Sequence, residues 1–109
     1  MRLILTEHLD AEPRAVADNL AKAVALGLDA AASRISEQRH ELVFETVDEG
    51  LRVHQGLSLL DGSELRVSGR PHLTTLEIVV PWAVDSSGAK YLAAHTFAQT
   101  VAAEVLATA

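Results

Sequence analysis

The feature that most constrains this sequence is a series of alternating apolar and polar residues between residues 42 and 82, interrupted only by short turn-forming segments. Its last member places Thr74, Leu76, Ile78, Val80 and Trp82 on one face. A period of two is typical of a strand that buries one face. Similar alternation covers 42–46, 52–59 and 64–69, with Asp61-Gly62 and Pro71-His72 between them. Strands joined by such short turns pair antiparallel, so the pattern predicts a four-stranded meander.

The lengths of the turns predict the register, because the apolar faces of paired strands must agree. A three-residue loop over 61–63, a turn at 71–72 and a four-residue loop over 47–50 achieve this. The predicted pairs are Leu59 with Leu65, Leu57 with Val67, Leu65 with Ile78, Val67 with Leu76, and Phe44 with Val53. The same registers bring Glu45 beside Arg52 and Arg66 beside Glu77 on the other face, which supports them independently.

Helices are predicted on either side of the meander. After a short apolar strand, Arg2–Thr6, Asp10 is an expected N-cap ahead of an early proline, Pro13. An apolar stripe follows at Val16, Leu20, Val24 and Leu28, and Gly27 could divide it into two shorter helices. A second helix is expected from about Gly88 to the end. The sequence therefore predicts one domain, 1–109, of the α+β class, in the order β-α-β-β-β-β-α. Its antiparallel sheet of about five strands should carry the helices on one face.

Composition excludes several kinds of function. Nine Lys and Arg against fifteen Asp and Glu give a net charge of −6, which argues against nucleic-acid binding. The absence of cysteine rules out disulfides, thiolate chemistry and zinc sites that use Cys. No apolar run is long enough to span a bilayer, and the first residues are too short for a signal peptide. A cytoplasmic protein is therefore expected.

Motifs for catalysis, phosphate binding or metal binding are missing from the sequence. The histidines are distributed over different elements, so neither a metal nor a cofactor is expected; they are His8, His40, His54, His72 and His95. The predicted register makes His54 a cross-strand neighbour of Arg70, on the same face as Arg52 and Arg66. This face is either a patch that binds an anion or an acidic partner, or a solvated surface on which Glu45 and Glu77 neutralise the arginines.

The inner face of the predicted sheet carries a few polar groups, which must be hydrogen-bonded if they are buried. Gln55, Thr46 and Thr74 point inward by parity, Trp82 closes the last strand, and His95 lies one turn after Tyr91 on the last helix. One interpretation is a small apolar pocket with these groups as polar contacts. The other is a filled core in which they satisfy one another or lie at its boundary. The candidate ligand-binding residues are Gln55, Thr74, Trp82, Tyr91 and His95, beside walls formed by Leu57, Val67, Ile78 and Val101.

Three segments carry a family resemblance: the meander with Asp61-Gly62 and Gly69-Arg70-Pro71, the strand Leu76–Trp82, and the alanine-rich helix Ala89–Ala107. In element order and texture the chain resembles the START-like (SRPBCC, polyketide-cyclase-like) superfamily. The resemblance implies a helix-grip fold, in which a curved antiparallel sheet wraps the last helix and a hydrophobic cavity lies between them. Members bind lipids, polyketides, hormones or other apolar molecules, and some are cyclases or dehydratases. That superfamily has no invariant catalytic motif, so no catalytic residue follows from it.

Three functions remain open from the sequence. The first is a domain that binds a small apolar ligand without catalysis, since no nucleophile, base and orienting group can be assembled. The second is a homodimeric or partner-binding module that pairs through a sheet edge, at Arg2–Thr6 or Glu41–Val47. The third is a small cyclase-like enzyme in which His95 acts as general base.

Overall fold

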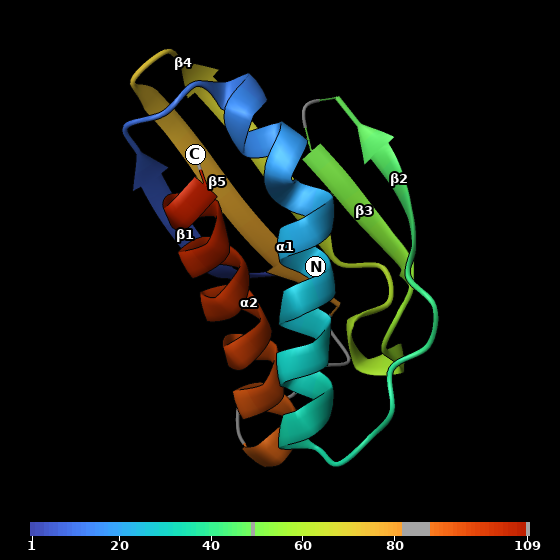
Figure 1. The fold of residues 1–109 in the computed structure, drawn as a ribbon. Helices are drawn as coiled ribbons and strands as arrows, with labels where there is room; N and C mark the ends of the chain where they lie inside the picture. The colour runs from blue at the N-terminus through green and yellow to red at the C-terminus, as the bar shows by residue number, and fades with distance from the viewer. Residues whose placement is uncertain (49, 82–87, 109) are drawn as a thin grey trace.

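A five-stranded antiparallel sheet carries two long helices on one of its faces (Figure 1). The computed structural model describes residues 1–48, 50–81 and 88–108. The elements are β1 (Arg2–Leu9), α1 (Pro13–Arg34), β2 (Val43–Val47), β3 (Gly50–Gln55), a short 3₁₀ turn η1 (Ser58–Leu60), β4 (Glu64–Arg70), β5 (Leu73–Val80) and α2 (Gly88–Thr108). The strands lie in the order β1-β5-β4-β3-β2. The predicted α+β class and element order are confirmed.

The hydrophobic core lies between the helices and the face of the sheet that they cover. The predicted stripe of α1 is fully buried at Val16, Leu20, Val24 and Leu28. α1 packs along α2 and over β3 and β4, whereas α2 lies over β1 and β5. The edge strand β2 is therefore left without a helix above it, and all five of its residues are exposed or half-buried.

Helix α1 is continuous, so the prediction that Gly27 could divide it is wrong. A Cβ atom at Gly27 would lie 2.9 Å from Phe97 Cδ1 and 2.9 Å from Val101 Cγ2. The glycine therefore lets α2 approach α1 closely, which compensates for its low helix propensity.

The start of α1 also differs from the prediction. Its N-cap is Glu12, without a side-chain hydrogen bond, and Pro13 occupies the first turn. The carboxylate of Asp10 instead contacts His72 Nδ1 at 2.8 Å. This contact joins the connection between β1 and α1 to the β4–β5 turn.

The structure confirms two of the three predicted hairpin registers. Leu65 pairs with Ile78 across β4 and β5, and the two strands stay in register to the turn at Pro71-His72. Phe44 pairs with Val53 across β2 and β3. The predicted charge neighbours are also confirmed as register pairs; these are Glu45 with Arg52, and Arg66 with Glu77.

The predicted register between β3 and β4 is wrong. β3 ends at Gln55, and Leu51, not Leu59, lies opposite Leu65. Leu57 and Leu60 are both buried around the 3₁₀ turn, where residues three apart share one side. The alternation of Leu57 with Leu59 predicts a strand, whereas the pair that the structure buries is Leu57 with Leu60, at the spacing of a 3₁₀ turn. The predicted neighbours His54 and Arg70 are consequently far apart in register, and the His54 Nε2 atom lies 3.2 Å from Glu45 Oε1 instead.

Within the described ranges, neither helix combines the length and the apolar character that a membrane crossing requires.

Candidate functional site

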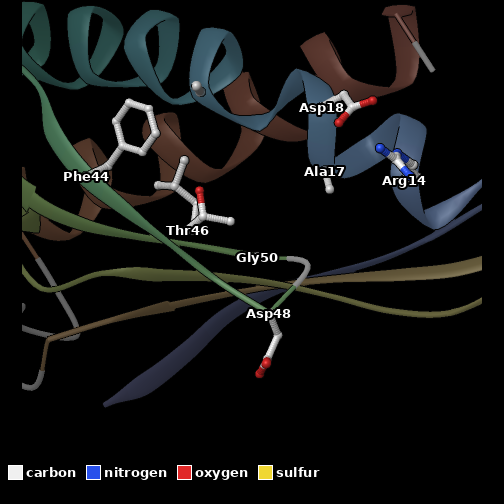
Figure 2. Close-up of a pocket in the computed structure, with 9 residues that line it drawn as sticks. Arg14, Ala17, Asp18, Phe44, Thr46, Asp48 and Gly50 are labelled. Atoms are coloured by element: carbon white, nitrogen blue, oxygen red, sulfur yellow. The ribbon is translucent and has the colours of Figure 1, made fainter.

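An open groove of about 380 Å³ lies between the first half of α1 and the edge strand β2 (Figure 2). Ala17 and Ala21 form its wall on the helix, and Phe44 and Thr46 form its wall on β2. Leu51 of β3 contributes to the lining between them. In Figure 2 the ring of Phe44 points from β2 toward α1, so an aromatic side chain faces two small ones across the groove.

The groove exists because β2 extends beyond the helix layer. α1 covers β3 and β4, so the inward side chains of β2 have no helix packed on them. Phe44 is 41% exposed, an unusual state for a phenylalanine in a chain that has only two. Alanines at 17 and 21 leave open the space that larger side chains on α1 would fill.

Charged side chains surround the rim of the groove. Arg14 and Asp18 lie one turn apart on α1, and Asp48 lies in the turn between β2 and β3. All three are exposed, and in the part of the chain that the structure describes none of them forms a hydrogen bond or an ion pair. The groove therefore combines an apolar interior with charged groups that are free to contact a bound molecule.

The polar residues predicted to share a pocket lie at different places in the fold. Thr74 is buried and donates a hydrogen bond from Oγ1 to the carbonyl oxygen of Ala11 at 2.6 Å, so its hydroxyl is satisfied by the backbone. It pairs with Gly69 near the end of β4. Gln55 is exposed at the last residue of β3, next to a register shift in the β2–β3 pairing, near the other end of the sheet. The inward orientation predicted for Gln55 therefore does not lead it into the core.

Tyr91 and His95 are the two candidates that the structure brings together. Their rings meet edge to face on α2, with centroids 4.5 Å apart and an interplanar angle of 71°. Both are half-buried, and neither lines the α1–β2 groove. The role of His95 as a general base stays a prediction, and His95 lies outside the α1–β2 groove. Trp82, the remaining candidate, lies outside the described residues.

The apolar residues predicted to line a pocket belong to the continuous core. Leu57, Ile78 and Val101 are each 1% exposed or less, and Val67 is 9% exposed. Sequence reasoning missed the groove residues, although a signal was present: Phe44 lies on a strand predicted to be an edge, and α1 is rich in alanine. That signal indicates an aromatic residue without a large side chain opposite it. It does not indicate the position of α1 relative to β2, on which the groove depends.

The outer face of the sheet carries a network of ion pairs. Arg52 donates hydrogen bonds to Glu45 and Glu64, each at 2.8 Å, and Arg66 donates one to Glu64 at 3.0 Å. The hydrogen bonds from the two arginines hold the pKa of Glu64 below its ordinary value, and the bond to Glu64 raises the pKa of Arg52. Arg52 and Arg66 therefore form ion pairs with acidic side chains, as in the interpretation of this face as a solvated surface. The partner of Arg66 is Glu64, whereas the prediction named Glu77.

Replacing Glu64 by glutamine is expected to remove a pH-dependent contribution to stability. Because the folded-state pKa of Glu64 is lowered from 4.5, its carboxylate stabilises the fold above that pH, and the stabilisation is lost as the pH falls through the lower value. Urea unfolding between about pH 7 and about pH 3 should show wild type more stable than Glu64→Gln at neutral pH, with the difference shrinking in acid. A difference that stays constant with pH would contradict this role.

Among residues 1–48, 50–81 and 88–108, no three His, Asp or Glu side chains are grouped as ligands for a metal ion. Comparisons with protein-family models, curated proteins and solved structures found no match to this chain.

Proposed function

We propose that this protein binds a small apolar molecule in the α1–β2 groove and has no chemistry of its own. The observation that carries the proposal is the half-exposed Phe44 ring, which faces Ala17 and Ala21 across a space of about 380 Å³. Ligand pockets commonly occupy about 300–1,000 Å³ and combine an apolar lining with a few polar groups. A flat apolar ligand would cover Phe44 and Leu51, and burial of that surface would supply the affinity.

The polar groups of the groove favour a ligand with one polar end. Thr46 offers a hydroxyl beside the apolar wall, and Arg14 offers at the rim a guanidinium that has no partner among the described residues. An acidic or hydroxyl group at the end of the ligand could bond to either. Asp18, one turn from Arg14, disfavours a ligand with several negative charges.

A START-like relationship forms part of this proposal. The element order β-α-β-β-β-β-α and the apolar ligand class support it. The groove lies beside α1 and β2, whereas a helix-grip cavity lies between the sheet and the last helix. Under this proposal the chain would keep the element order of the START-like fold and would bind its ligand beside α1 and β2, away from the last helix.

The proposal is tested by filling the groove from α1. Ala21→Trp places a large side chain in the groove and is expected to abolish the fluorescence enhancement of 8-anilinonaphthalene-1-sulfonate, an apolar anion of suitable size. Ala103→Trp is the matched control, because Ala103 is exposed on α2 and does not line the groove. Equal dye binding by both variants would place the apolar site elsewhere, and no enhancement with wild type would contradict an open apolar groove.

A native mass spectrum of the gently purified wild-type protein provides the second readout. Extra mass of small-molecule size on the monomer, absent from Ala21→Trp and kept by Ala103→Trp, is the expected result. A monomer without added mass that also fails to bind the dye would contradict the proposal.

A second candidate function is a homodimer that pairs through β2. All five residues of this edge strand are exposed or half-buried, and Val43 and Phe44 are 45% and 41% exposed. β2 also lacks the lysines and prolines that commonly protect a sheet edge from pairing. A dimer in the same native mass spectrum, lost on replacing Val43 by lysine, would favour this function over ligand binding.

A further inference from the structure

Strand β4 extends beyond the strand beside it. Its pairing with β5 runs from Glu64 to Arg70, whereas its register with β3 includes only Glu64 and Leu65. β3 begins only at Gly50, after the chain leaves β2 and turns through Asp48. In the described part of the chain, Val67–Arg70 therefore have a strand neighbour on one side only. A hollow of about 240 Å³ lies at this step, lined by the end of the β2–β3 hairpin and by Leu65, Arg66 and Val67.

The backbone of this open segment is oriented for pairing. The carbonyl oxygen of Ser63 accepts a hydrogen bond from the N–H of Val53 at 2.9 Å, so this carbonyl points toward β3, whereas the N–H of Ser63 donates to the carbonyl oxygen of Leu60. In an antiparallel sheet alternate residues direct their N–H and C=O groups to the same neighbour. Leu65 and then Val67 continue this series, and among the described residues no strand residue is registered with Val67 on the β3 side. An extended chain placed there could form hydrogen bonds with the N–H and the C=O of Val67.

Side chains at the open segment indicate which sequence would fit. Existing cross-strand pairs on the outer face match opposite charges, as Arg52 does with Glu45 and with Glu64. Arg66 and Arg70 have the same parity as Glu64, and Arg70 forms no hydrogen bond or ion pair within the described residues. An added strand along Val67–Arg70 would set an outer residue opposite Arg70 and would end beside Arg66, so acidic residues are favoured. Its intervening residues would lie beside Val67 on the core side, so apolar residues are favoured there.

We propose that the open edge of β4 binds an extended peptide in which acidic and apolar residues alternate. Recognition would occur by strand addition, with hydrogen bonds to the backbone at Val67 and charge pairs to Arg66 and Arg70. The open segment spans four residues, Val67–Arg70, or about 13 Å of strand at roughly 3.3 Å per residue. The hollow beside this edge shares Asp48, Gly50 and Leu51 with the α1–β2 groove. The residues proposed to bind the peptide, Arg66, Val67 and Arg70, do not line that groove, so the two proposals can be tested separately.

The test uses a fluorescent peptide of about six residues in which glutamate and valine alternate, a length that covers the open segment. Fluorescence anisotropy with the full chain at low salt should show saturable binding, and a lysine-for-glutamate peptide should not bind. Two further peptides carry N-methyl groups on alternate residues, one on the valines and one on the glutamates. Strand addition requires one of the two to lose binding while the other keeps it, because only one set of N–H groups faces β4. Equal binding by both would overturn the proposal in favour of simple charge attraction.

A pair of variants locates the site. Arg70→Glu is expected to weaken binding about fivefold, the scale of an exposed charge pair, while Arg34→Glu makes the same charge change at the end of α1 and should leave binding unchanged. Circular dichroism checks that both variants are folded. Equal weakening by the two variants would overturn the site. A wild-type dimer in sedimentation that Arg70→Glu dissociates and the peptide does not would assign the edge to a second copy of the chain and would also overturn the proposal.

Discussion

Replacing Phe97 by alanine is expected to lower the free energy of unfolding by about 3–5 kcal/mol. Phe97 has no exposed surface and is the largest fully buried side chain among the described residues. Its ring lies on α2 against Gly27 of α1, where an added Cβ atom would lie 2.9 Å from Phe97 Cδ1. The truncation removes apolar contacts and leaves a cavity that two rigid helices cannot close. Urea unfolding followed by circular dichroism measures the change.

Phe44→Ala is the matched control, since it makes the same chemical change at the only other phenylalanine of the chain. Because Phe44 is 41% exposed on an edge strand, the expected loss is below about 1 kcal/mol. Under the proposed function, this variant should still lose dye binding. Equal destabilisation by the two variants would contradict the assignment of Phe97 to the core and Phe44 to the groove.

Replacing Gly50 by alanine is expected to destabilise the protein by about 2–3 kcal/mol, although it adds a single methyl group. The added Cβ would lie 2.2 Å from the carbonyl oxygen of Leu65 and 3.2 Å from its carbonyl carbon. Both are backbone atoms, so a side-chain rotation cannot relieve the contact and one strand must move. The measurement is again urea unfolding, with the chemical shifts of β3 and β4 amides as a local readout.

Ser68→Ala provides the comparison for Gly50→Ala. Ser68 is exposed on β4, and its change to alanine should alter stability by less than about 0.5 kcal/mol. If Gly50→Ala were as stable as Ser68→Ala, the close approach of β3 to β4 at this residue would be wrong.

The sequence predicts well those parts of the fold that local chemistry controls. The β4–β5 register follows from the turn at Pro71-His72, because a two-residue connection leaves one alignment of the apolar faces. The register between β3 and β4 does not follow, because three leucines lie close together here: Leu57 and Leu59 fit a strand, and Leu57 and Leu60 fit a 3₁₀ turn. Distinguishing the two requires the packing of these leucines beneath α1 and α2, which is not a local property.

The candidate site was harder to predict for a related reason. Thr74 was predicted to face inward and does, but its hydroxyl is satisfied by Ala11, a residue 63 positions earlier in the chain. Gln55 has the parity of an inward residue, yet it is exposed at the last residue of β3. The groove depends on how far α1 lies from β2, and this distance is set by the packing of α1 on α2. No spacing within a single strand or helix encodes it.

The short contact between β3 and β4 has a consequence for the β2–β3 hairpin as a mechanical unit. The hairpin is joined to the sheet at two registered residue pairs and by the hydrogen bonds of Val53 with Gly62 and Ser63. Strands β1, β4 and β5 share much longer ladders. The hairpin is therefore the part of the sheet that opens at the lowest free energy. Phe44 and Thr46 belong to this hairpin, whereas Ala17 and Ala21 belong to α1. We therefore expect local opening of the hairpin to move the β2 wall of the groove relative to the α1 wall and so to change the width of the groove.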